Sequence, residues 1–156
     1  MPLAFCAAGF SKQQKVDIGS ADLANFGAMP IQLALQPRDG YLRFEVTGMR
    51  IRGEFAREML GVWQRVADEC QAGGFSKALG ISNVSGPVPL VELFEVGERT
   101  PQILARAGCR RVAYVVLGDK EALDALKFGE DVAVNRGQIA KVFADESTAI
   151  AWLMEP

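Results

Sequence analysis

The sequence predicts a single α/β domain built on a small four- to five-stranded mixed sheet, with an N-terminal hairpin and helical crossovers. Apolar and polar residues alternate through residues 31–46, which is typical of an antiparallel hairpin. Apolar residues recur at helical spacing in residues 53–72, and residues 111–117 form an apolar run typical of a central parallel strand. The length of 156 residues matches one domain with one core.

The predicted hairpin turns at Pro37-Arg38-Asp39-Gly40, where proline and glycine favour a tight turn. Since alternate residues of a strand point to opposite faces, one face of each strand is expected to be buried. The apolar residues on the two sides of the turn are Ile31, Leu33, Leu35, Leu42, Phe44 and Val46.

The residues before the hairpin lack a regular pattern. Residues 1–28 are predicted to form an N-terminal extension, and residues 29–156 the folded domain. The alternative is that Met29 is the physiological start. No basic residue precedes the apolar stretch at the N-terminus, so no export signal is predicted.

The first helix is predicted over residues 53–72, and Gly73-Gly74 ends it, as glycine commonly does at a helix C-terminus. A short buried strand is expected over residues 75–82. The turn Asn83-Val84-Ser85-Gly86-Pro87 then leads into a second helix over residues 89–107.

The second helix contains Thr100-Pro101, and proline removes a helical hydrogen bond. We therefore expect a kink there or two short helices. The apolar stripe of this region consists of Leu90, Leu93, Phe94, Ile103 and Leu104.

The C-terminal part continues the alternation of strands and helices. Asp119 is expected to cap a third helical region over residues 120–136, which is either continuous or broken near Gly129. A last strand is predicted over residues 140–143, followed by a helix capped by Asp145. The order of elements indicates mostly parallel later strands joined by helices.

The composition excludes several functional classes. Histidine is absent, which removes Ser-His-Asp and Cys-His catalysis and histidine-based metal sites. The net charge of −2 and the pI of about 5.2 disfavour a nucleic-acid partner. No cofactor, metal or catalytic residue is predicted, and the apolar runs are too short for a transmembrane segment.

The three cysteines, Cys6, Cys70 and Cys109, are widely spaced and odd in number. They encode neither a disulfide framework nor a metal motif, so a reducing, cytoplasmic location is expected. Cys70 and Cys109 are predicted to be small core residues.

Several C-terminal motifs together resemble one known family. They are Arg110-Arg111-Val112-Ala113-Tyr114-Val115-Val116, Phe128, Asn135-Arg136-Gly137, Val142-Phe143 and Ala149-Ile150-Ala151-Trp152-Leu153. With the order of elements, they make residues 30–154 similar to the SpoIIAA-like family of the STAS superfamily. The resemblance implies a four- or five-stranded sheet with helices largely on one face, a fold shared more remotely with Sec14-type lipid-binding domains, and a role that is not primarily enzymatic.

The resemblance also implies a regulatory serine. In the anti-sigma-factor antagonists of this family, the phosphorylated serine follows a central strand within an Asp-Ser-Ser-Gly-like motif. The corresponding residues here are Asn83, Val84, Ser85 and Gly86, so Asn83 replaces the leading aspartate and Val84 the first serine. Ser85 is the candidate phosphorylation site.

The leading candidate site is the crevice around residues 82–86, because ligands gather at the carboxyl ends of parallel strands and helix N-termini attract anions. Alternatively, Ser85 and Asp119 only cap helices, and Arg136 only complements a helix dipole. The residues predicted to bind a ligand or partner are Ser82, Asn83, Ser85, Gly86, Gly118 and Arg136.

Other charged residues have less specific interpretations. Glu92, Glu95 and Glu98 recur at three-residue spacing and are expected to form a solvated helix face rather than a carboxylate site. Arg50, Arg52 and Arg57 are expected to belong to the ordinary charged surface, although an acidic partner or a lipid headgroup is an alternative.

Three functions follow from these observations. The leading hypothesis is a non-enzymatic binding or regulatory module for a protein partner or for a small anionic or apolar ligand. The second is a Sec14-like carrier of a small lipid, and the third is a histidine-free carboxylate enzyme. An apolar cavity favours the second, two converging carboxylates the third, and a filled core the first. Homodimerisation through a sheet face or edge is also predicted as an option.

Overall fold

The computed structural model describes residues 14–17 and 31–156. Most of the predicted extension, residues 1–28, lies outside the described residues, as does Cys6. Within the described part, the fold is α/β, with a mixed sheet of five strands (β2–β6), four helices, and a short strand β1 added at the sheet edge.

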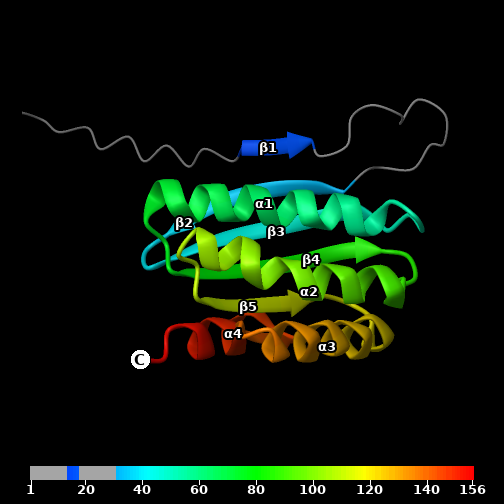
Figure 1. Ribbon diagram of the computed structural model, residues 1–156. Helices are drawn as coiled ribbons and strands as arrows, with labels where there is room; N and C mark the ends of the chain where they lie inside the picture. Colours follow the sequence, from blue (N-terminus) through cyan, green and yellow to red (C-terminus); the bar gives the residue numbers. More distant parts are fainter. Residues whose placement is uncertain (1–13, 18–30) are drawn as a thin grey trace, which may run out of the picture.

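The order along the chain alternates strands and helices after the hairpin (Figure 1). The elements are β1 (Gln14–Asp17), β2 (Gln32–Arg38), β3 (Tyr41–Met49), α1 (Phe55–Gly73), β4 (Lys77–Ser85), α2 (Leu90–Arg106), β5 (Arg111–Val116), α3 (Lys120–Asn135), β6 (Ile139–Phe143) and α4 (Glu146–Leu153). The strand order in the sheet is the order in the sequence. β1, β2 and β3 pair antiparallel, whereas β3 to β6 pair parallel.

The predicted hairpin is confirmed. Arg38 pairs with Tyr41, so Asp39 and Gly40 alone form the turn, and Gly40 adopts a φ of 85° that favours glycine. The alternation buries the predicted set of apolar residues, which consists of Ile31, Leu33, Leu35, Leu42, Phe44 and Val46.

Helices cover the two faces of the sheet unequally (Figure 1). α1, α2 and α3 lie side by side against one face, where the larger core cluster forms. α4 packs on the other face, over β4 and β5, where a smaller cluster includes Leu79, Ile81 and Val115. The expectation of helices largely on one face is thus confirmed for three of the four helices.

Neither helix is divided in two. α2 is one helix through Pro101, so the alternative of two short helices is wrong, and α3 is continuous through Gly129. Gly129 serves close packing instead, because a Cβ atom there would lie 3.1 Å from Leu93 Cδ1 of α2. Gly97 of α2 is equally close to Val132 of α3, so the pair of glycines lets the two helices approach.

Because β3, β4 and β5 are parallel, their carboxyl ends lie together. β3, β4 and β5 all end, and α1, α2 and α3 all begin, at the same edge of the sheet (Figure 1). We call this edge the carboxyl edge. Across the described residues, the structure contains no helix with the length and apolar character needed to span a membrane.

Gly80 of β4 provides a test of core packing. A Cβ atom at this position would lie 2.5 Å from Phe44 Cζ and 2.5 Å from Tyr114 Cδ2, because both rings close over the glycine. We predict that Gly80→Ala lowers the free energy of unfolding by about 1–3 kcal/mol, the usual cost of overpacking a core. Urea denaturation measures the change, and an unaltered midpoint would contradict this packing.

Candidate functional site

The carboxyl edge brings several of the predicted site residues into one region. Ser82 pairs with Val116 on β5, and its carbonyl accepts a hydrogen bond from Leu117 N at 3.1 Å. Gly86 follows the end of β4, and Gly118 follows the end of β5. The two loops that carry these glycines are therefore neighbours, as the sequence predicted.

The predicted role of Ser85 at a helix start is wrong. β4 extends to Ser85, which pairs with Met49 because β3 is equally long, and α2 begins only at Leu90 after Pro89. Ser85 is exposed, and its hydroxyl donates to Gly48 O at 3.2 Å rather than capping the helix. Neither the helix dipole nor the capping alternative therefore applies to this serine.

Ser82 and Asn83 point to opposite faces of the sheet, since they are consecutive strand residues. Ser82 is 2% exposed and faces the helices α1–α3, whereas Asn83 is exposed. The structure therefore does not bring both side chains to one site.

Arg136 lies away from the carboxyl edge. α3 begins at that edge and is 16 residues long, so its C-terminal end is about 24 Å away. There Arg136 forms an ion pair with Glu98 of α2. The structure therefore does not bring Arg136, a predicted ligand-binding residue, together with Ser85 and Gly86.

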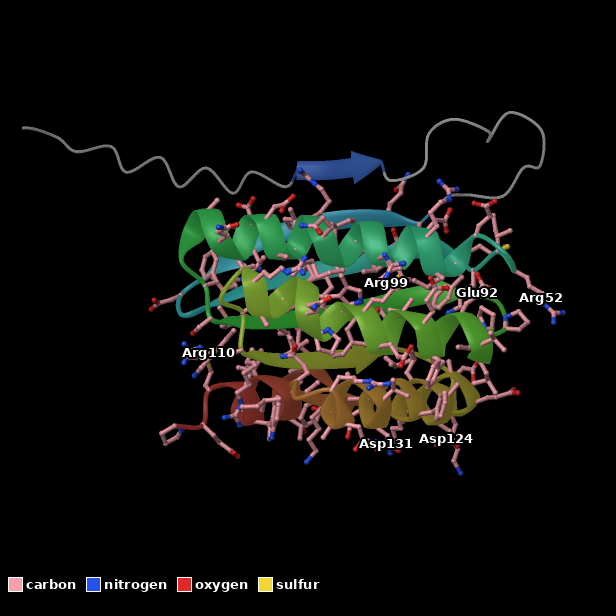
Figure 2. All side chains as sticks on the ribbon, in the orientation of Figure 1. Arg52, Glu92, Arg99, Arg110, Asp124 and Asp131 are labelled. Carbon is pink, nitrogen blue, oxygen red and sulfur yellow. The ribbon has the colours of Figure 1, made fainter. Side chains whose placement is uncertain are left out.

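Arg50 is buried at the carboxyl edge, although it was predicted to be a surface residue. Its relative exposure is 7%, its Nη1 donates to Gly86 O at 2.8 Å, and its backbone N donates to Ser85 O at 2.9 Å. Desolvation lowers the pKa of its guanidinium, although Tyr114 and Asp119 oppose the shift. Arg52, two residues further on, extends outward into solvent (Figure 2).

An apolar cavity of about 100 Å³ lies next to Arg50, between the sheet and helices α1, α2 and α3. Arg50, Ser82 and Tyr114 supply polar groups to its lining. Burial raises the pKa of the Tyr114 phenol, and the Ser82 hydroxyl and the Arg50 charge oppose that rise. Thr100, which is 6% exposed, also lines the cavity, and its Oγ1 has no hydrogen-bond partner.

A second, larger concavity of about 1000 Å³ lies between the first turns of α2 and α3 and the loop at Gly86. We call it the groove. It contains the exposed side chains of Leu90, Val91, Phe94 and Phe128. The two phenylalanine rings stack, with their centroids 6.5 Å apart. Its other lining residues include three acidic ones, Asp119, Glu121 and Asp124.

The predicted apolar stripe of α2 is only partly buried. Leu93 and Leu104 are buried as expected, but Leu90 is 55% and Phe94 43% exposed. Helical spacing alone does not show which residues of the stripe stay exposed, because this depends on where α3 contacts α2, which is around Leu93, Gly97 and Glu98. The exposed aromatic pair could be found only once the two helices were placed side by side.

The three regularly spaced carboxylates of α2 have three different roles. Glu92 caps α1 from outside, accepting hydrogen bonds from Gly53 N at 3.0 Å and Ala56 N at 3.2 Å, so the expected solvated role is wrong for this residue (Figure 2). Glu95 pairs with Arg99, and Glu98 pairs with Arg136. In residues 14–17 and 31–156, no group of three or more Cys, Asp or Glu side chains is arranged to hold a metal ion.

Two sequence-based assignments of structural residues are confirmed. Asp119 caps α3, accepting from Glu121 N at 2.8 Å and Ala122 N at 3.1 Å. Cys70 and Cys109 are buried core residues that contact each other, and this contact, together with burial, raises the pKa of the Cys109 thiol.

No protein-family model matches the chain, and no curated protein or solved structure matches it. The geometry of the carboxyl edge, with its buried arginine, cavity and groove, is therefore the basis for the functional argument.

Glu92 provides a test of how the carboxyl edge is held together. We predict that Glu92→Ala lowers the free energy of unfolding by about 1 kcal/mol, because two N–H groups at the start of α1 lose their acceptor. Glu92→Gln keeps an acceptor oxygen and should cost less. Chemical denaturation compares the variants, and equal stability of the alanine variant and the unaltered protein would contradict the capping role.

Proposed function

We propose that this chain is a non-enzymatic binding module that docks a protein partner in the groove at the carboxyl edge. The observation that carries the proposal is the cluster of exposed apolar side chains there. Val91 is 86% exposed, and Leu90, Phe94 and Phe128 are each more than 40% exposed. Contiguous exposed apolar side chains bordered by polar residues are typical of interaction sites.

The charge of the groove favours a basic partner. Asp119, Glu121 and Asp124 line it, and no lysine or arginine does. A groove between two helices, with an apolar floor and an acidic border, suits an amphipathic helix whose apolar face lies against Phe94 and Phe128. Basic residues on the flanks of that helix would meet the acidic side chains and give orientation and specificity.

The family resemblance supports the same class of function. We propose that the chain is a SpoIIAA-like member of the STAS superfamily, whose relatives in that family are regulatory rather than enzymatic. The α/β sheet with three helices on one face is compatible with this proposal. Ser85 remains a candidate phosphorylation site, since it is exposed and lies next to Gly86 of the groove.

The two alternative functions have less support. The cavity lies where a Sec14-like carrier would hold its ligand, but its volume of about 100 Å³ is smaller than the roughly 150 Å³ of an engineered cavity that binds benzene. A lipid chain therefore does not fit the cavity as it stands. For a carboxylate enzyme, Glu130 is the one carboxylate lining the cavity, and its Oε2 accepts from Val142 N at 2.6 Å.

The docking proposal is tested with a synthetic peptide of about 18 residues whose leucines and lysines form the two faces of an amphipathic helix. Fluorescence anisotropy should show binding to the full chain. We predict that Phe94→Ser with Phe128→Ser weakens binding about tenfold or more, equivalent to at least about 1.4 kcal/mol, because the apolar contact is lost.

Two controls make the test specific. Val134→Ser replaces another exposed apolar residue of α3, outside the groove, and should leave binding unchanged. A peptide with glutamate in place of lysine should bind more weakly because of the acidic border. Equal binding of both peptides, or a dimer of the protein that the two serine substitutions dissociate, would overturn the docking of a basic partner.

A further inference from the structure

Arg50 carries a charge in a position that is costly for the fold. A buried guanidinium stays protonated, and burying it without an anionic partner is unfavourable. Within the described residues, no carboxylate lies within ion-pair distance of Arg50, and Asp119 acts on its charge only from further away. The one hydrogen bond of its side chain is from Nη1 to Gly86 O. Its Nε and Nη2 therefore have donors that no described side chain uses.

The surroundings of Arg50 match one end of a small amphipathic molecule. Ser82 and Tyr114 provide hydroxyl groups to the same cavity wall. Most of the remaining lining is apolar and includes Met59, Trp63, Val112 and Leu126. Glu130, Gln138 and Lys141 also line the cavity, and the Glu130 carboxylate accepts a hydrogen bond from Val142 N. A charged group at one end of an apolar space is the arrangement that holds an acid with a hydrocarbon body.

Thr100 is an independent sign that the cavity has an occupant. Its hydroxyl is buried among the cavity-lining residues and makes no hydrogen bond, although buried polar groups are normally paired. The position of Thr100 in the middle of α2 separates it along the helix from the carboxyl edge. Thr100 thus leaves one buried hydroxyl on the cavity wall unpaired, and Arg50, which lines the same cavity, has N–H donors besides the one that bonds to Gly86 O.

We propose that the cavity beside Arg50 binds a small organic monocarboxylate, with its carboxylate on the free donors of Arg50 and its short apolar body between the sheet and α2. The planar guanidinium is suited to a carboxylate because two parallel N–H donors can meet its two oxygens. This site is separate from the groove, so it does not depend on the docking of a protein partner.

The size of the cavity limits the ligand. A space of about 100 Å³ holds a body of a few carbon atoms and excludes a long acyl chain. Inorganic phosphate fits the site less well, because it leaves the apolar space empty and finds a single arginine. The inferred ligands are therefore short acids with a carbon body, rather than phosphorylated compounds or membrane lipids.

The test uses sodium butyrate and the full chain, with binding followed by NMR chemical shifts. Butyramide has the same shape without the charge, and we expect its dissociation constant to be about tenfold or more higher. Acetate and decanoate, which are shorter and longer, should both bind more weakly than butyrate. Equal affinity for butyrate and butyramide, or tighter binding of inorganic phosphate, would overturn the proposal.

Two variants locate the site. Arg50→Met removes the charge but keeps an apolar side chain of similar length, and should raise the dissociation constant for butyrate about tenfold or more. Ala140→Ile fills the cavity from β6 without touching Arg50 and should also abolish binding. Val134→Ser, outside the cavity, should bind as the unaltered protein does. If Ala140→Ile folds and binds butyrate with unchanged affinity, the cavity is not the site.

Discussion

The backbone connection between the end of β3 and the end of β4 is the constraint on which the carboxyl edge depends. Arg50 N donates to Ser85 O at 2.9 Å and joins the two chain ends, and the buried Arg50 side chain adds a bond to Gly86 O. The next turn of the chain leads to α2, where Glu92 holds the first N–H groups of α1. Together, these hydrogen bonds fix where α1 and α2 begin relative to the sheet.

The same hydrogen bonds lie between two proposed binding surfaces, the cavity and the groove. On the inner side lie the cavity and its hydroxyl groups, and on the outer side lies the groove with its stacked phenylalanines. Gly86 stands between them, since its carbonyl accepts from Arg50 and the residue also lines the groove. A Cβ atom at this glycine would lie 3.2 Å from Arg50 O, so there is little room for a side chain at position 86. Both proposed binding surfaces therefore border the loop at Gly86.

The sequence predicted the elements that local patterns determine. Alternation located the hairpin, helical spacing located α1, and an apolar run located β5. It failed where neighbours decide the outcome: Ser85 joins a strand because β3 offers it a partner, and Gly129 permits helix packing rather than a break. Pro101 likewise stays within one helix because that helix packs against its neighbours on both sides.

The candidate site was predictable in position but not in composition. The rule that ligands bind at the carboxyl ends of parallel strands pointed to the loops at Gly86 and Gly118. Arg50 and Arg52 look alike in the sequence, yet only Arg50 is buried, because the loop after β4 closes over it. Phe94 and Leu93 are adjacent members of one apolar stripe, and the sequence does not show that Leu93 packs against Gly129 of α3 and is buried whereas Phe94 stays exposed.

The most direct test of this account is the free energy of unfolding of Arg50→Met without any ligand. If Arg50 is retained for binding, methionine should fill its space with no loss of stability, or with a gain, because a buried charge without a partner is removed. Gly86 is exposed, so its carbonyl can bond to water instead. A loss of about 3 kcal/mol or more would contradict the account and show that Arg50 serves the fold itself.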